Sequence, residues 1–212
     1  MSYTLSLLSP SSQHFSATSL AQSLHTAWVR VEAGGDADWQ QLVLQHADAD
    51  DIVQIDRLPV ATGTEGEAAI QQFLLQIAAA MPLSAAQWLL DYLLQVRTVY
   101  RFTLCEGIHE ADGWDEMDAF KQALHERAGG IFQSDNEGFS NEAGFHILWQ
   151  FADDASGPWW MAVRQNGEWQ PFQMELSDPE QKEAFLLGQV PAGAEVVQME
   201  TSDMNTGNNT NA

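Results

Sequence analysis

Cysteine is nearly absent from this sequence, because only Cys105 among 212 residues is a cysteine. One thiol cannot close a disulfide within the chain, so nothing in the composition indicates an oxidising compartment. Long apolar runs are absent too, since no segment approaches the roughly 18 consecutive apolar residues of a membrane span. The first ten residues contain no Lys or Arg, which a secretion signal would carry. We therefore expect a cytoplasmic protein that does not bind membranes.

Basic residues are scarce. Eight Lys and Arg stand against 30 Asp and Glu, which gives a formal net charge of −22. Such a field repels phosphate backbones and anionic lipids, so we expect no direct nucleic-acid binding. The same field favours encounter with a basic protein partner, although solubility alone is a sufficient explanation of the charge. Composition leaves the oligomeric state open.

The common catalytic and metal-binding motifs are also missing. The sequence has no Gly-rich phosphate loop, GxSxG elbow, HExxH or CxxC motif. His125 begins a pattern like that of a zinc helix, but the position of the second histidine is Gly129. The acidic loop that begins at Asp135 resembles a calcium loop, but its glycine comes three positions later instead of five. We expect no cofactor and no metal. The missing motifs weigh against an enzymatic function but do not exclude it.

Apolar residues are plentiful, at 45% of the chain with eight Trp and ten Phe, and they supply a substantial core. Their periodicity predicts an α+β fold, mainly an antiparallel sheet with helices packed on one side. The chain is interpreted either as one domain or as two lobes meeting near residue 97. In the second interpretation, residues 1–96 form a helix-rich lobe, 97–199 form an antiparallel α+β lobe, and 200–212 form a flexible polar tail.

Four predictions of local structure follow from the pattern of residues. Residues at helical spacing predict one face of a helix at Ala17, Leu20, Leu24 and Trp28. A later helix, with Asp112 as its N-cap, has a predicted inner stripe of Trp114, Met117, Phe120, Leu124 and Ala128. Alternating residues from Phe145 to Phe151 predict a strand. Two capping boxes, opened by Thr64 and Ser84, predict two further helices.

The most informative local signal is Asn166-Gly167, which predicts a two-residue hairpin turn between strands at 159–165 and 168–176. This turn places Arg164 opposite Trp169 and leaves Trp160 farther along the same face. Trp and Arg dominate binding hot spots, so Trp160, Arg164 and Trp169 are candidate partner-binding residues. The competing interpretation is that a helix or the other lobe covers this face, because Trp is usually buried.

One group of residues has the chemistry of a catalytic site. Asp135 and Glu137 lie in the loop 133–146 and His146 ends it, so a carboxylate and a histidine are the candidate acid and base. We weigh this against an ordinary turn followed by a polar residue on the wetter face of a sheet, which we prefer. If the catalytic interpretation holds, Asp135 or Glu137 shares a pocket with His146.

Acidic residues gather in the segment 106–118, which contains no Lys or Arg. The candidates for binding a basic partner in this segment are Glu110, Asp112, Asp115 and Glu116, joined by Asp153 and Asp154 from a later loop. The leading functional hypothesis is an acidic intracellular protein-binding module of the immunity type, which occludes a basic partner. One alternative is a small hydrolase or transferase, and another is a mimic of nucleic-acid charge, which requires acids spaced along a surface.

Overall fold

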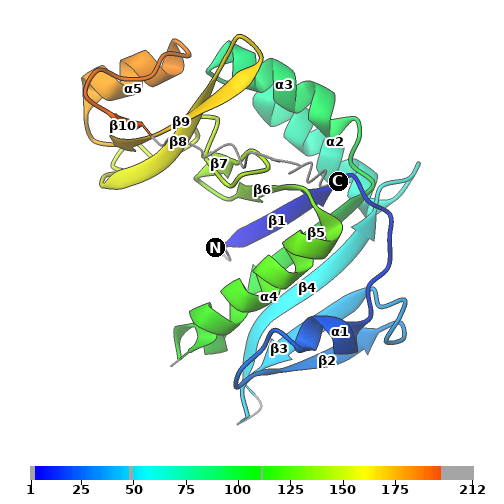
Figure 1. Ribbon diagram of the computed structural model, residues 1–212. Helices are drawn as coiled ribbons and strands as arrows, with labels where there is room; N and C mark the ends of the chain where they lie inside the picture. The colour runs from blue at the N-terminus through cyan, green and yellow to red at the C-terminus, as the bar shows by residue number, and fades with distance from the viewer. Residues whose placement is uncertain (1–2, 48–49, 111, 197–212) are drawn as a thin grey trace, which may run out of the picture.

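The structure is a computed structural model that describes residues 3–47, 50–110 and 112–196 (Figure 1). The polar tail expected at 200–212 lies outside these residues. Within them the protein is 30% helical and 31% strand, with a large antiparallel sheet, which confirms the α+β class. No helix in the described part of the chain has the length and apolar character needed to cross a membrane.

The larger sheet contains strands from both sides of residue 97, and each neighbouring pair is antiparallel. Strand β5 pairs with β1 on one side and with β4 on the other, so this sheet spans residue 97 instead of ending there. In spatial order its strands are β2 (Trp28–Ala33), β3 (Gln41–Gln45), β4 (Asp51–Pro59), β5 (Thr98–Leu104), β1 (Thr4–Ser9), β6 (Ile131–Ser134) and β7 (Gly138–Phe139).

Helices cover both faces of this sheet, which corrects the expectation of helices on one side. Successive side chains of a strand point to opposite faces. Leu7 of β1 packs in one core with α1 (Ala17–Ala21) and α4 (Gly113–Ala128). Leu8 packs in another core with α2 (Glu65–Ile77) and α3 (Leu83–Leu93). The two helix pairs therefore lie on opposite faces, and α1 and α4 lie in front of the sheet in Figure 1.

A smaller sheet contains β8 (Pro158–Gln165), β9 (Glu168–Glu175) and β10 (Glu195–Val196). The predicted hairpin is confirmed, since Arg164 lies opposite Trp169 and Gln165 opposite Glu168. The turn has positive φ angles of 52° at Asn166 and 89° at Gly167, as a turn of this type requires. Helix α5 (Pro179–Leu186) follows, with the Asp178 side chain accepting backbone N–H bonds at its start.

The first predicted helix is much shorter than its sequence pattern. Helix α1 ends at Ala21, and Trp28 begins β2 with 56% of its surface exposed. The apolar spacing extends through Leu24, which packs against the core from outside the helix. Pairing of Trp28 through Ala33 with β3 outweighs the helical pattern at this point.

The prediction of a strand at 145–151 is wrong. The side-chain oxygen of Asn141 accepts hydrogen bonds from the N–H groups of Ala143 and Phe145, which folds the chain into a local turn instead of an extended ladder. Only His146 forms β-bridges in this segment, one to Ser140 and one to Met161 of β8. The segment thus bonds to β8 through His146 and to β7 through the N–H of Ile147.

The predicted helix caps differ in outcome. Thr64 accepts the N–H of Glu67 at the start of α2, and Glu67 accepts the N–H of Gly63, as a capping arrangement requires. The second capping box is wrong, because α3 begins at Leu83 after Pro82 and makes no side-chain cap bond. Proline already fixes the backbone in the extended conformation of an N-cap residue.

Candidate functional site

A tight turn between β6 and β7 places Glu137. The N–H of Glu137 bonds to the carbonyl of Ser134, and Asn136 and Gly138 adopt positive φ angles of 63° and 102°. The same turn is tied to the start of β1, because Asp135 accepts the N–H of Thr4 at 3.1 Å and donates its own N–H to the carbonyl of Thr4. The side chain of Tyr3 therefore lies beside this turn and lines three neighbouring cavities.

Glu137 lines two of these cavities. The smaller has a volume of about 280 Å³ and the larger about 660 Å³. Burial raises the pKa of the Glu137 carboxyl, against the opposing effects of hydrogen bonds with Tyr3 and Ser134 and of the Lys121 charge. A carboxyl in such surroundings accepts a proton more readily than one in water, and a nearby cation would favour its ionised form.

His146 lines the smaller cavity together with Glu137. Its ring packs against Trp159, with centroids 4.8 Å apart, and against Phe151 at 5.6 Å. Burial lowers the pKa of His146 to about 4, so the ring is neutral near pH 7. Its Nδ1 atom is buried and finds no hydrogen-bond partner among the residues that the structure describes. Glu137 and His146 are thus brought to one cavity, although the histidine also belongs to an aromatic cluster.

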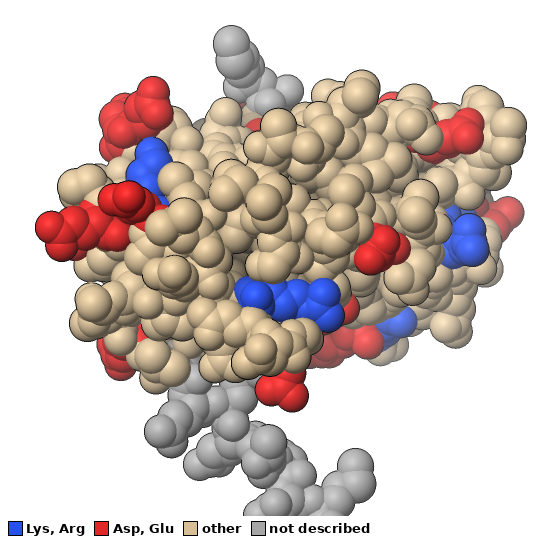
Figure 2. Space-filling view, turned by 90° about the horizontal axis from the view of Figure 1, so that it is seen from above, with Lys and Arg blue, Asp and Glu red and all other residues tan. Residues whose placement is uncertain are grey.

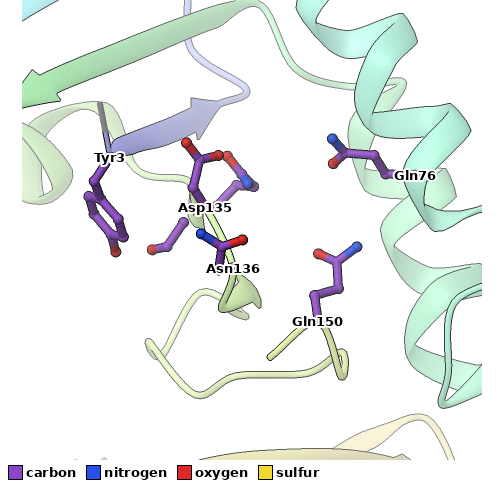
Figure 3. Close-up of a pocket in the computed structure, with 7 residues that line it drawn as sticks. Tyr3, Gln76, Asp135, Asn136 and Gln150 are labelled. Atoms are coloured by element: carbon purple, nitrogen blue, oxygen red, sulfur yellow. The ribbon is translucent and has the colours of Figure 1, made fainter. Parts of the chain in front are cut away.

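Asp135 lies in a different cavity from His146. This cavity, of about 680 Å³, is polar, and Figure 3 shows Asp135 among Tyr3, Gln76, Asn136 and Gln150. Helix α2 supplies Gln76, and Gln150 comes from the segment before β8. The three candidate catalytic residues therefore separate into a pair at the smaller cavity and one carboxylate on the other side of the β6–β7 turn.

Most of the predicted acidic surface is exposed, since Glu110, Asp112 and Asp115 all lie at the surface around the start of α4. Asp112 has a φ angle of 67° and is the N-cap of α4, without a side-chain cap bond. Glu106 is also exposed, in the 3₁₀ helix η1 (Glu106–His109). These acids form an exposed group in two adjoining elements.

Glu116 does not belong to this surface, which corrects its prediction as a partner-binding residue. Its side chain is 1% exposed and accepts backbone N–H bonds from His25, Thr26 and Ala27, together with the Thr26 hydroxyl. Burial alone would raise its pKa, but these hydrogen bonds outweigh burial and lower the pKa. Glu116 holds the segment before β2 against α4, which is a structural role.

The burial of Trp114 was predicted wrongly from the sequence pattern. The pattern placed it in the inner stripe of α4, but 45% of its surface is exposed. The buried stripe of α4 continues through Gly113 and Glu116 in the first turn, and Trp114 lies at the edge of this stripe. Its ring packs near that of His109, with centroids 6.4 Å apart.

The larger cavity at Glu137 is bounded by this tryptophan. Strand β5, helix η1 and helix α4 bring together three apolar walls, Leu104, Ile108 and Trp114. The described residues that line the cavity are Tyr3, Leu104, Cys105, Glu106, Ile108, His109, Trp114 and Glu137. The wall residues Leu104, Ile108 and Trp114 come from elements that the sequence pattern does not place side by side. We refer to this space as the Trp114 cavity.

The predicted surface on the hairpin is partly covered. Trp169 is half-buried beneath α3, where its ring meets that of Trp88 edge to face at 5.0 Å. Arg164 lies over the Trp169 ring at 5.9 Å, and Trp160 is 41% exposed. Figure 2 views the molecule from above, the side on which Figure 1 places α3 and the hairpin, and shows a largely uncharged face with basic side chains in its lower middle and acidic side chains mainly towards its margins.

Asp153 and Asp154 are exposed in the loop that precedes β8. Neither lines the Trp114 cavity or the smaller cavity at Glu137. The described residues also contain no group of three or more His, Cys, Asp or Glu placed to hold a metal ion. Burial raises the pKa of the Cys105 thiol, and the Asp51 charge adds to this effect, so Cys105 lacks the properties of an activated nucleophile.

Comparisons with known proteins find no likeness from which a function could be transferred. No protein-family model matches the chain, and neither the curated proteins nor the solved structures contain a match.

Proposed function

We propose that this protein is an acidic protein-binding module that occludes a basic protein partner, on the physical plan of bacterial immunity proteins. The observation that carries the proposal is Trp114, a large aromatic side chain exposed at the rim of an apolar cavity among exposed acids. Tryptophan is enriched at the centres of protein interfaces, and surrounding charges set the rate and the choice of partner.

The charge of the chain supports the same proposal. A net charge of −22 steers a cationic partner towards the molecule from a distance, and Glu106, Glu110, Asp112 and Asp115 present part of that charge beside Trp114. Steering alone gives rate but little affinity, since exposed ion pairs are weak. An apolar anchor that desolvates on binding supplies the affinity, and Trp114 provides it in this proposal.

Affinity capture from the native cells, with wild-type protein and two tryptophan variants, tests this function. Trp114→Ala should lose the stoichiometric partner, with a cost in binding of about 2 kcal/mol or more. Trp28→Ala is the matched control, because Trp28 is exposed on β2 and does not line the Trp114 cavity. Equal capture by both variants would contradict the proposed site.

The on-rate for the captured partner gives a second measurement. Raising the salt concentration from about 50 to 500 mM should lower the on-rate tenfold or more, because screening removes electrostatic steering. An on-rate that does not change with salt would remove the electrostatic part of the proposal and leave only the apolar anchor.

A second candidate function is a small hydrolase or transferase, and one observation favours it. Glu137 and His146 line one cavity with the hydroxyl groups of Tyr3, Ser134 and Ser140. A carboxyl of raised pKa and a neutral histidine are a suitable acid and base. Ester and phosphoester hydrolysis by the wild type, lowered about 100-fold or more in both Glu137→Gln and His146→Asn, would support it. Wild-type protein without such activity would count against it.

A further inference from the structure

The Trp114 cavity has a chemical character that deepens the proposed function, on which this inference rests. Its volume is about 660 Å³, and Leu104, Ile108 and Trp114 form apolar walls. Its charged groups are the carboxylates of Glu106 and Glu137, and no Lys or Arg is found among the described residues that line it. The cavity thus combines apolar walls with two acidic side chains, while Lys121, which lines the neighbouring smaller cavity, offsets part of the Glu137 charge.

This combination fits a side chain with an apolar stem and a cationic head. A long aliphatic stem lies favourably along Leu104, Ile108 and the Trp114 indole, and the head remains beside carboxylates. An anionic or purely apolar guest brings no cation to the two carboxylates. The groups able to titrate around such a head are Glu106, Glu137, His109, Cys105 and Tyr3, and Lys121 acts on Glu137 from the neighbouring cavity.

Arginine fits the cavity better than lysine. Its guanidinium is planar, is more weakly hydrated than an ammonium and stacks on aromatic rings, and two aromatic side chains, Trp114 and Tyr3, line the space. The guanidinium also bonds carboxylates through a fork of parallel N–H groups, so one head can reach Glu106 or Glu137. Lysine offers a point charge without the planar contact.

We propose that the Trp114 cavity receives one arginine side chain of the basic partner, with its stem against Trp114 and its guanidinium at Glu106 and Glu137. Burial holds the pKa of Glu137 above its usual range in the free protein. A bound guanidinium favours the ionised carboxylate, so it acts against the effect of burial on the pKa of Glu137.

Titration of the full chain with an acetylated and amidated Ala-Arg-Ala tripeptide tests this proposal at pH 8. Nuclear magnetic resonance follows the indole N–H of each tryptophan. We expect saturable shifts at Trp114 with a Kd of about 1–10 mM and little change at Trp28, since one side chain binds weakly by itself. The same tripeptide with citrulline, a neutral analogue of arginine, should bind about tenfold more weakly.

Two glutamine variants separate the cavity from the general acidic field. Glu106→Gln and Glu137→Gln should each weaken binding of the arginine peptide by about fivefold, while Glu183→Gln, on an exposed acid of α5 outside the lining, should change it by less than twofold. Equal binding of the citrulline peptide would overturn the proposal. Absence of any shift at Trp114 up to about 50 mM peptide would overturn it as well.

Failure of this inference is distinguishable from failure of the proposed function. Capture of a partner that depends on Trp114, without arginine-peptide binding, overturns the arginine assignment and leaves the binding module intact. Arginine-peptide binding with the expected variant effects, but no Trp114-dependent partner, supports the cavity and counts against the module.

Discussion

The start of α4 and the β8–β9 hairpin both carry tryptophan beside charge, and the structure gives them opposite surroundings. On the hairpin, Trp169 packs under Trp88 of α3 and is half-buried. At the start of α4, Trp114 is 45% exposed and borders a cavity. The sequence pattern makes the hairpin face a candidate binding surface, with a covered face as the competing interpretation, and assigns Trp114 to the core. The comparison teaches that periodicity identifies a face of an element but not what covers that face.

The largest expected effect concerns the inner side of the α4 start. Glu116→Ala should lower the free energy of unfolding by about 4 kcal/mol, because it leaves three backbone N–H groups and a hydroxyl without their shared acceptor. Asp115→Ala is the control, since Asp115 is exposed and should cost less than about 0.5 kcal/mol. Urea denaturation measures both. Similar losses of unfolding free energy in the two variants would show that Glu116 contributes no more to stability than the exposed Asp115.

The next effect concerns His146, whose ring packs against Trp159 of the hairpin strand. Its pKa falls to about 4 in the folded protein, from about 6.5 when unfolded, because burial disfavours the charged ring. Stability is therefore full above pH 6.5 and is lost as the pH falls towards 4, by about 3 kcal/mol in total. Denaturation at several pH values measures this loss.

The control for that measurement is His146→Gln, which removes the titrating ring. The difference in unfolding free energy between wild type and this variant should narrow as the pH falls from 6.5 to 4. A difference that stays constant across this range would show that His146 is not held neutral. Its ring would then be more exposed to water than its packing against Trp159 indicates.

Local sequence signals predicted those parts of the fold that depend on neighbours in the chain. Asn166-Gly167 specified the hairpin and its register, and Thr64 specified the start of α2. The strand at 145–151 failed because its backbone N–H groups bond to separate segments, that of Phe145 to the Asn141 side chain and that of Trp149 to the carbonyl of Met81. The long helix ending at Trp28 failed because strand pairing with β3 is a contact that helical spacing cannot reveal.

The candidate site depends on contacts between distant segments, which explains why the sequence predicted little of it. Glu137 and His146 were candidates by residue type, and the structure places them at one cavity while Asp135 lies in another. The Trp114 cavity needs Tyr3, β5, η1 and α4 together, so no local pattern indicates it. Glu116 looked like its exposed neighbours, because its partners lie about 90 residues away in sequence.

The two tryptophans provide the most direct test of the comparison. Trp169→Ala should lower the free energy of unfolding by about 2 kcal/mol, less than for a fully buried tryptophan, because the ring is half-buried against Trp88. Trp114→Ala should cost less than about 1 kcal/mol in stability while weakening partner binding. Thermal and urea denaturation give the stabilities. If Trp114→Ala were the more destabilising of the two, the α4 side would be the internal surface and the proposed interface would have to move to the hairpin.

The smallest expected effect tests the backbone at the acidic start of α4. Asp112 has a φ angle of 67°, in the left-handed region, and its side chain makes no cap bond that would offset this conformation. Glycine adopts the region without steric cost, but it also loses more freedom on folding, so Asp112→Gly should stabilise the protein by only about 0.5 kcal/mol. Asp112→Ala removes the same charge but keeps a Cβ atom, and it should be less stable than the glycine variant by about 1 kcal/mol. Since both variants lose one exposed acid, a difference between their stabilities reports the backbone alone, and any weakening of the partner on-rate that they share reports the charge. Equal stabilities would mean that the chain enters α4 without a left-handed residue, and the acids around Trp114 would then need a different arrangement.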